Sequence, residues 1–191
     1  MRILTVLVLA MLAWPSAAAA QETAPKAELA FGYNYMRANI LPSCGCFNAN
    51  GGSVSAAFNA NNWFGIAGEF GVARTGNVQS SGRDLMLFTY QAGPRFSLRR
   101  ERGTAFFHAL FGGGRAAGSL YDVPLPGRTS TGPDGSWALT LGGGVDVKAS
   151  SRVAVRIFQA DWVHTRFHNG GNNKQNNFRI TAGIVFRIGQ R

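Results

Sequence analysis

The segment Phe178-Arg-Ile-Thr-Ala-Gly-Ile-Val-Phe-Arg-Ile188 alternates between two kinds of side chain without a break. One parity is apolar throughout, from Phe178 to Ile188. The other parity is mostly polar or small and consists of Arg179, Thr181, Gly183, Val185 and Arg187. Because successive side chains of a strand point to opposite faces, this segment predicts a strand with one apolar face and one largely polar face.

Seven earlier segments show the same period of two. They cover residues 27–37, 52–61, 63–74, 85–99, 104–115, 137–148 and 153–165. Each is near or above the roughly 9–11 residues that a tilted strand needs to cross a bilayer. In 153–165 the apolar parity changes at Ile157 and Phe158, which predicts a bulge there that keeps Arg156, Gln159 and Asp161 on the polar face.

The connections between these segments alternate in length. Tight turns are expected around residues 61–62, 100–103 and 149–152, and long loops at 38–51, 75–84, 116–136 and 166–176. Short periplasmic turns and longer outer loops are typical of outer-membrane barrels. Since lipid-exposed backbone amides need partners, the strands must close on themselves. The sequence therefore predicts an all-β fold, an eight-stranded antiparallel up-and-down transmembrane β-barrel with both termini in the periplasm.

The residue types on the two faces favour a membrane barrel over a soluble one. A soluble barrel usually carries many Lys and Glu residues on its outer face. Here the polar parity is mostly Gly, Ala, Ser, Thr and Asn, which suits a crowded lumen. Aromatic residues near strand ends fit the girdles of a membrane barrel, namely Tyr33, Tyr35, Trp63, Trp137, Trp162 and Phe186.

Residues 1–20 are typical of a secretory signal peptide. Met1-Arg2 gives a positive start, an apolar run follows, and Ala18 and Ala20 are suitably placed for cleavage before Gln21. A membrane anchor is the weaker alternative, because the apolar run is too short to span a bilayer as a helix. Residues 21–191 are then a single barrel domain.

The chain is strongly basic, with 19 Lys and Arg against 9 Asp and Glu and a net charge of +10. An exported protein rarely meets nucleic acid, so the expected partners are outer-membrane lipids and lipopolysaccharide. The alternative is that the excess only balances local carboxylates and aids solubility during export.

Nine charged residues fall on the predicted inner face: Glu28, Glu69, Arg95, Asp146, Lys148, Arg156, Asp161, Arg179 and Arg187. Eight strands enclose a lumen that side chains just fill, so a compensating ion network is expected there. Asp146 should lie close to Arg156 across a tight turn, and barrel closure should bring Glu28 to Arg187. The functional alternative is a gated ion path.

Segments such as Tyr90-Gln-Ala-Gly-Pro-Arg-Phe96 and Leu139-Thr-Leu-Gly-Gly-Gly-Val-Asp-Val147 resemble the small outer-membrane β-barrel family of the OmpA barrel domain and OmpX-like proteins, a porin family. The resemblance implies architecture and no activity. Thr181, Gly183, Phe186 and Ile188 also resemble the C-terminal signal that the barrel-assembly machinery reads. Ile188 stands where an aromatic residue is commoner, and three residues follow it.

Two further groups of residues are candidate sites. Cys44 and Cys46 lie in the first long loop, in an oxidising compartment, so a local disulfide is expected, with a free or intermolecular pair as the alternative. His164 and His168 lie near the outer rim without the His-x-Ser pattern of lipid-modifying barrels. No catalytic residue, metal or cofactor is predicted.

These features lead to one functional hypothesis and two alternatives. The chain is expected to be a non-enzymatic integral protein of the bacterial outer membrane, with a structural or surface role and loops available for interaction. A narrow porin-like channel for ions or small solutes is the first alternative. A lipid-modifying enzyme is the second.

Overall fold

The computed structural model describes residues 24–39, 46–124 and 130–190. They form eight strands: β1 (Pro25–Ala38), β2 (Phe47–Asn59), β3 (Phe64–Thr75), β4 (Leu85–Arg100), β5 (Gly103–Ala117), β6 (Asp134–Lys148), β7 (Val153–Thr165) and β8 (Gln175–Gln190). One short 3-10 turn, η1 (Val78–Ser80), lies between β3 and β4. Residues 1–20 lie outside the described part, so the signal peptide stays a prediction.

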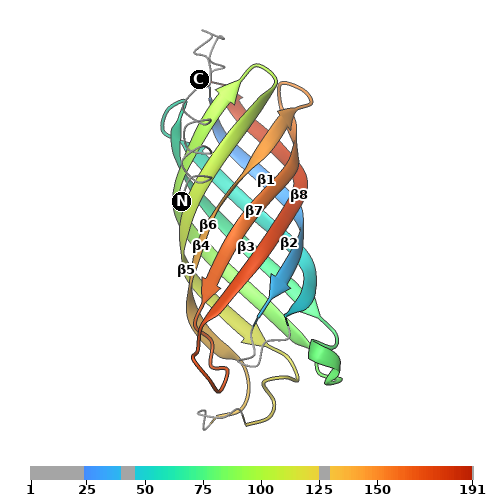
Figure 1. Ribbon diagram of the computed structural model, residues 1–191. Coiled ribbons are helices and arrows are strands. Elements are labelled where there is room, and N and C mark those ends of the chain that lie inside the picture. The colour runs from blue at the N-terminus through green and yellow to red at the C-terminus, as the bar shows by residue number, and fades with distance from the viewer. Residues whose placement is uncertain (1–23, 40–45, 125–129, 191) are drawn as a thin grey trace, which may run out of the picture.

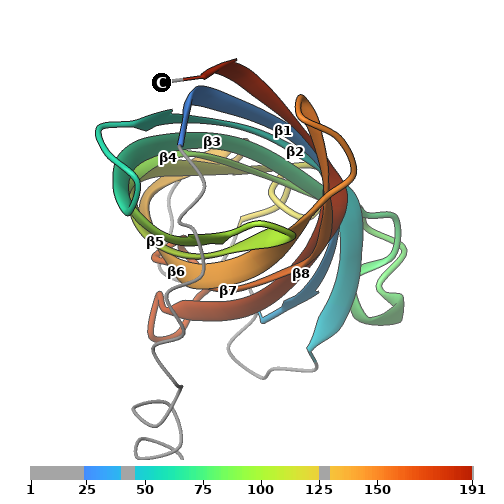
Figure 2. The ribbon, with the colours of Figure 1, turned by 90° about the horizontal axis from the view of Figure 1, so that it is seen from above.

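The strands make one closed antiparallel barrel in chain order, and β8 returns to pair with β1. Figure 1 shows steeply tilted strands, and Figure 2 shows the ring seen along its axis. The predicted fold class is therefore confirmed. Within the described residues no helix is both long and apolar enough to traverse a bilayer.

The alternation of the sequence becomes an outer apolar face and an inner polar face. On β1, Phe31 and Tyr33 are exposed on the outside, whereas Glu28 and Asn34 are buried inside. On β5, three consecutive inner positions are filled by Phe106, His108 and Leu110, as their parity predicts. Large apolar side chains that face outward suit hydrocarbon, and the buried polar ones fill the lumen.

The predicted bulge on β7 is confirmed. Across from β6, Val145 pairs with Phe158 while Asp146 pairs with Arg156, so Ile157 is an extra residue in the ladder. The register against β8 shifts at the same place. Ile157 and Phe158 both face outward, which returns the following residues to the original facing.

The tight turns lie where they were predicted, but the first outer loop is shorter than expected. β2 begins at Phe47 and not at residue 52. Phe47 and Ala49 turn inward and are buried with Met36 and Ala38 of β1. The hairpin is longer because burying these side chains stabilises strand pairing beyond the level of the lipid-facing residues.

Candidate functional site

The half of the lumen nearer the chain termini holds a group of five charged side chains, called here the inner ionic layer: Glu28, Arg95, Arg99, Asp146 and Arg156. The Glu28 carboxylate forms ion pairs with Arg95 and Arg99, each with a nitrogen–oxygen distance of 2.7 Å. The Asp146 carboxylate accepts hydrogen bonds from Arg156 at 2.8 Å and 3.1 Å and forms an ion pair with Arg95 at 3.5 Å. All five are buried, and the carboxylates alternate with guanidinium groups, as the desolvation of charges demands.

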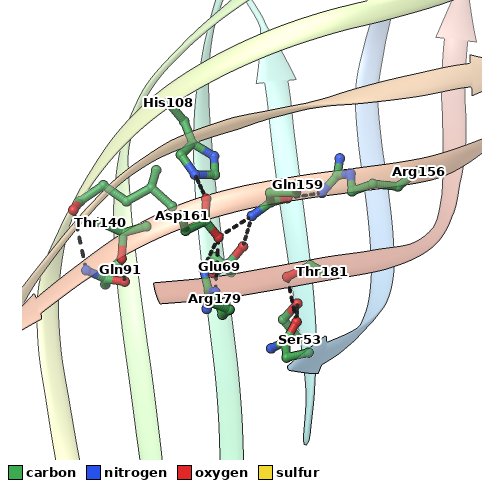
Figure 3. A network of polar contacts seen from close by, with 12 residues as sticks. Ser53, Glu69, Gln91, His108, Thr140, Arg156, Gln159, Asp161, Arg179 and Thr181 are labelled. Carbon is green, nitrogen blue, oxygen red and sulfur yellow. Dashed lines mark hydrogen bonds and ion pairs between the residues drawn. The ribbon is translucent and has the colours of Figure 1, made fainter. Parts of the chain in front are cut away.

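A second group lies deeper in the barrel and is called here the central ionic layer: Glu69, His108, Gln159, Asp161 and Arg179. The Arg179 guanidinium donates to Asp161 at 2.7 Å and forms an ion pair with Glu69 (Figure 3). His108 Nε2 lies 2.9 Å from the other oxygen of Asp161. Gln159 Nε2 donates to Asp161 at 2.8 Å and to Glu69 at 3.3 Å.

The two layers are connected through β7. Arg156 Nη1 donates to Gln159 Oε1 at 2.6 Å, so the side chains before and after the bulge join the inner layer to the central layer. The inward Phe106 ring lies against both Arg95 and Arg156, whose Cζ atoms are 4.3 Å and 4.5 Å from its centroid. These cation–π contacts suit guanidinium groups held away from water.

Glycines on neighbouring strands make room for the central layer. A Cβ atom at Gly142 would overlap the carboxylate of Asp161. A Cβ atom at Gly71 would come 3.0 Å from the Arg179 guanidinium. The glycine content of the inner face is therefore part of how the sequence fits large charged side chains into a narrow barrel.

Little space remains between the two ionic layers. A cavity of about 10 Å³ lies between the layers, next to Glu69, His108 and Arg156. Such a volume holds about one water molecule. The described lumen is therefore a packed interior here and not an aqueous channel.

The other end of the lumen is closed by apolar side chains, called here the apolar plug: Met36, Ala38, Phe47, Ala49, Ala73, Val78, Leu85, Leu87, Ala116, Leu120, Tyr121 and Phe167. Val78, Leu120 and Phe167 come from the outer loops rather than from strands. Phe167 is fixed on both sides, since its backbone exchanges hydrogen bonds with the Gln175 side chain at 2.8 Å and 3.1 Å. The loops therefore fold into the mouth of the barrel.

The structure places eight of the nine charged residues predicted for the lumen at buried positions: Glu28, Glu69, Arg95, Asp146, Arg156, Asp161, Arg179 and Arg187. Lys148 differs, because it is the last residue of β6 and is only half-buried. The expected contact between Asp146 and Arg156 is confirmed.

Barrel closure sets Glu28 opposite Arg187 in the β1–β8 register, as expected. The two shortest ion pairs of Glu28 nevertheless go across the lumen to Arg95 and Arg99. Arg187 donates to Thr104 at 3.4 Å. Arg99 was missed, although it shares the inward parity of Arg95, because it stands at the end of its strand beside the exposed Arg100.

The residues of the expected C-terminal assembly signal lie on both faces of β8. Thr181 faces inward and donates to Asn34 at 2.7 Å. Gly183 lies against β1, where a Cβ atom would overlap the carbonyl oxygen of Phe31. Phe186 and Ile188 are exposed on the outer face. Recognition of this strand by the assembly machinery stays a prediction.

Of the outer cysteine and histidine residues, the structure describes Cys46, His164 and His168. Cys44 is outside the described residues and Cys46 is exposed, so the disulfide stays a prediction. His164 packs between the rings of Trp137 and Trp162, with centroids 5.2 Å and 5.4 Å away. His168 faces Asp134 at 3.2 Å instead.

Outside the barrel wall, one hydrogen-bonded pair joins two outer loops. Ser119 donates to the Asp84 carboxylate through its hydroxyl at 2.5 Å and through its backbone N–H at 3.0 Å. These hydrogen bonds hold the pKa of Asp84 below its usual value of 3.8. The pair fixes the loop before β4 against the loop after β5.

Several solved structures have a similar fold. Neisserial surface protein A aligns with a TM-score of 0.65 and 16% identity over 87% of this chain and 100% of its own. Ail of Yersinia pestis, in complex with the heparin analogue sucrose octasulfate, aligns with a TM-score of 0.58 and 17% identity over 86% of this chain and 99% of its own. OprG of Pseudomonas aeruginosa aligns with a TM-score of 0.52 and 9% identity over 88% of this chain and 98% of its own.

At these identities the structural matches support the fold and not a shared activity. None of the curated protein sequences compared with the chain gives a significant match. The family model for the outer membrane protein beta-barrel domain matches residues 4–186. With a closed eight-stranded barrel and an outward apolar face, the chain belongs to this family and resides in the bacterial outer membrane.

Proposed function

We propose that this protein is a non-enzymatic surface protein whose closed barrel holds ordered outer loops for contact with other molecules. The observation that carries this proposal is the double closure of the lumen. Two connected ionic layers fill one half, and the apolar plug fills the mouth. A barrel closed in this way serves as a scaffold for its loops rather than as a conduit.

The chemistry of the outer loops favours an acidic partner. Arg166 and Lys174 are exposed there, and Arg83 is partly exposed. Because Val78, Leu120 and Phe167 fix the loops to the barrel mouth, these cations are presented on a pre-organised surface. The similar protein Ail was solved with a heparin analogue. We therefore propose a sulfated glycan or another polyanion as the partner of this face.

Three measurements test the proposal. The folded protein in a planar bilayer should give no reproducible single-channel steps, and such steps would favour the channel alternative. The protein should bind immobilised heparin, and Arg83→Gln with Lys174→Gln should weaken that binding about fivefold or more, in a salt-dependent manner. Equal binding by the variant would remove the glycan from the proposal. A change in lipid A on overproduction would point to the enzyme alternative.

The biogenesis of the barrel is a separate proposal. Residues 1–20 would be removed on export, and the β8 residues Thr181, Gly183, Phe186 and Ile188 would be read by the barrel-assembly machinery. N-terminal sequencing of the protein from outer membranes tests the first step, with Gln21 as the expected first residue.

A further inference from the structure

The lipid-facing surface of β1, β2 and β3 contains an apolar groove of about 530 Å³. Its floor lies at Gly52, which stands between Tyr33 of β1 and Val72 of β3 in the strand register. Below this row, Val54 and Phe70 form the next outward positions. Because a glycine separates the larger side chains of Tyr33 and Val72, the outer surface of the barrel is recessed at this point.

Polar side chains stand directly above the groove. Arg37 is opposite Asn48, and Arg74 is opposite Asn50, so all four belong to the next outward rows of the same three strands. Arg37 Nη1 donates to Asn48 at 2.7 Å, and Tyr33 donates to Asn50 at 3.0 Å. The Arg74 side chain is 61% exposed, with its nearest carboxylate, Asp84, at 3.7 Å.

The change from apolar to basic side chains is where the outer boundary of the membrane is expected on this face. Below it the outward side chains next to the groove are apolar, namely Phe31, Val54 and Phe70, and above it the chain enters the outer loops. The two arginines are therefore at the level of lipid head groups, and the groove is at the level of the first part of an acyl chain.

We propose that β1–β3 forms a binding site for one lipopolysaccharide molecule, with an acyl chain in the groove at Gly52 and lipid A phosphate at Arg37 and Arg74. The arginines lie two strands apart, roughly 10 Å across the sheet, which suits an anionic head group broader than a single phosphate. Arginine pairs with phosphate through charge-assisted, often bidentate, hydrogen bonds. The proposal depends on the outer-membrane location and not on the role of the loops.

The opposite side of the barrel provides an internal comparison. Arg115 and Arg166 are also exposed near the outer rim there. Below them aromatic rings cover the wall. The Trp137 ring packs against the rings of Phe111 and His164, with ring centroids 6.2 Å and 5.2 Å apart. This side has rim cations above a filled wall, so it should attract anionic lipid without holding a particular molecule.

The test is native mass spectrometry of the detergent-purified, folded protein titrated with diphosphoryl lipid A. One equivalent should be retained at low lipid concentration. Arg37→Gln with Arg74→Gln should weaken retention about thirtyfold, if each cation contributes as cations at an anionic membrane surface do. Val54→Trp, which fills the groove, should also weaken retention while leaving the arginines in place.

Matched controls separate a built site from general attraction. Arg115→Gln with Arg166→Gln removes the same charge, and Leu141→Trp adds the same ring to the opposite lipid face; both should retain lipid A as the unmodified protein does. Each variant must still migrate faster unheated than boiled on a gel, which establishes that it is folded. Phosphatidylglycerol and lipid A without phosphate should be retained less well.

Equal losses in the two double-arginine variants would overturn the proposal, as would retention of phosphatidylglycerol as strong as that of lipid A. Unchanged retention in Val54→Trp would remove the groove from it. Failure of this proposal is distinguishable from failure of the proposed surface role. The surface role is tested by conductance and by heparin binding of the Arg83 and Lys174 variant, whereas the lipid A site is tested at Arg37, Arg74 and Val54.

Discussion

Arg179 is the residue on which the central ionic layer depends most. It is almost completely buried and lies between Glu69 and Asp161, which come from different strands. Replacing it with methionine would leave two buried carboxylates without their cation. We expect Arg179→Met to lower the free energy of unfolding by about 3–5 kcal/mol, measured by urea unfolding in lipid vesicles with tryptophan fluorescence.

The control for this prediction is Arg115→Met, which removes an exposed arginine from the outer face and should change the free energy of unfolding by less than about 0.5 kcal/mol. Combining Arg179→Met with Glu69→Gln and Asp161→Asn should restore much of the loss, because no uncompensated charge then remains. Equal free energies of unfolding of Arg179→Met and Arg115→Met would show that the ion pairs of the central ionic layer do not stabilise the fold.

The Asp84–Ser119 pair predicts a local dependence on pH. Hydrogen bonding lowers the pKa of Asp84 in the folded state. The ionised Asp84 carboxylate therefore stabilises the contact between the two loops above about pH 4, and this stabilisation is lost as the pH falls through the lowered pKa. Ser119→Ala should raise the pKa of Asp84 toward 3.8. Carboxyl carbon shifts in an NMR titration measure this directly, and an unchanged titration would show that the two loops are not paired in solution.

At the scale of elements, the bulge on β7 gives a test of register. Deleting Ile157 would leave Arg156 followed by Phe158, so Asp146–Arg156 and Val145–Phe158 would become consecutive pairs of a regular ladder. All side chains would keep their faces. We therefore expect the shortened protein to fold and to show the faster migration of unheated protein on a gel.

Deleting Ala160 is the matched control, because it removes one residue from the same strand at a regular position. Either the residues on one side of the deletion would change faces, placing Asp161 or Arg156 against lipid, or the bulge would be lost, placing Gln159 against lipid and Phe158 in the lumen. This variant should fail to show the gel shift. A folded Ala160 deletion would mean that the ionic layers do not fix the register of β7.

Gly183 has two explanations that an experiment can separate. It matches the expected assembly signal, yet a Cβ atom there would overlap the carbonyl oxygen of Phe31 where β8 closes on β1. If close packing is the reason, Gly183→Ala should slow or reduce folding of the purified protein into detergent, where no assembly machinery is present. Gly68→Ala, whose Cβ atom would have its nearest neighbour at 3.8 Å, should fold normally. Normal folding of Gly183→Ala would leave recognition as its role.

The elements that could be predicted are those determined by neighbours in sequence. Period-two alternation identified all eight strands, and the phase change at Ile157 identified the bulge, because facing depends only on parity. Parity also placed Asp161 and Arg179 inside. Their direct pairing with each other needs the relative height of β7 and β8, which no local pattern contains.

The apolar plug could not be predicted for the same physical reason. Val78 and Phe167 are isolated apolar residues in polar loops, and Leu120 is followed only by Tyr121. The closed barrel brings these side chains to one place. The early start of β2 follows from the plug, because Phe47 is held inward by it. Long-range packing therefore decided the outer end of the molecule, whereas local alternation decided the membrane-spanning part.

For the whole molecule, the lumen has two barriers in series that differ in chemistry. An ion entering from outside meets the apolar plug, where it would lose its hydration without gaining a partner. Beyond it lie the connected ionic layers, which occupy the cross-section with fixed charges. Either barrier alone should be sufficient to stop conduction. A variant that removes only one of them should therefore give no single-channel steps.

This arrangement predicts a specific pattern in planar-bilayer recordings. Phe47→Ala with Phe167→Ala opens the plug, and Glu69→Ala, Asp161→Ala and Arg179→Ala together remove the charges of the central layer without leaving a carboxylate unpaired there. Each set should give no single-channel steps, whereas the combined variant should give them. Conductance from the plug variant alone would mean that the ion pairs of the two layers open readily enough to let ions pass, and would favour a gated channel. Silence of the combined variant, once its folding is verified by gel shift, would place the remaining barrier in the inner ionic layer, where Arg95 and Arg99 still pair with Glu28.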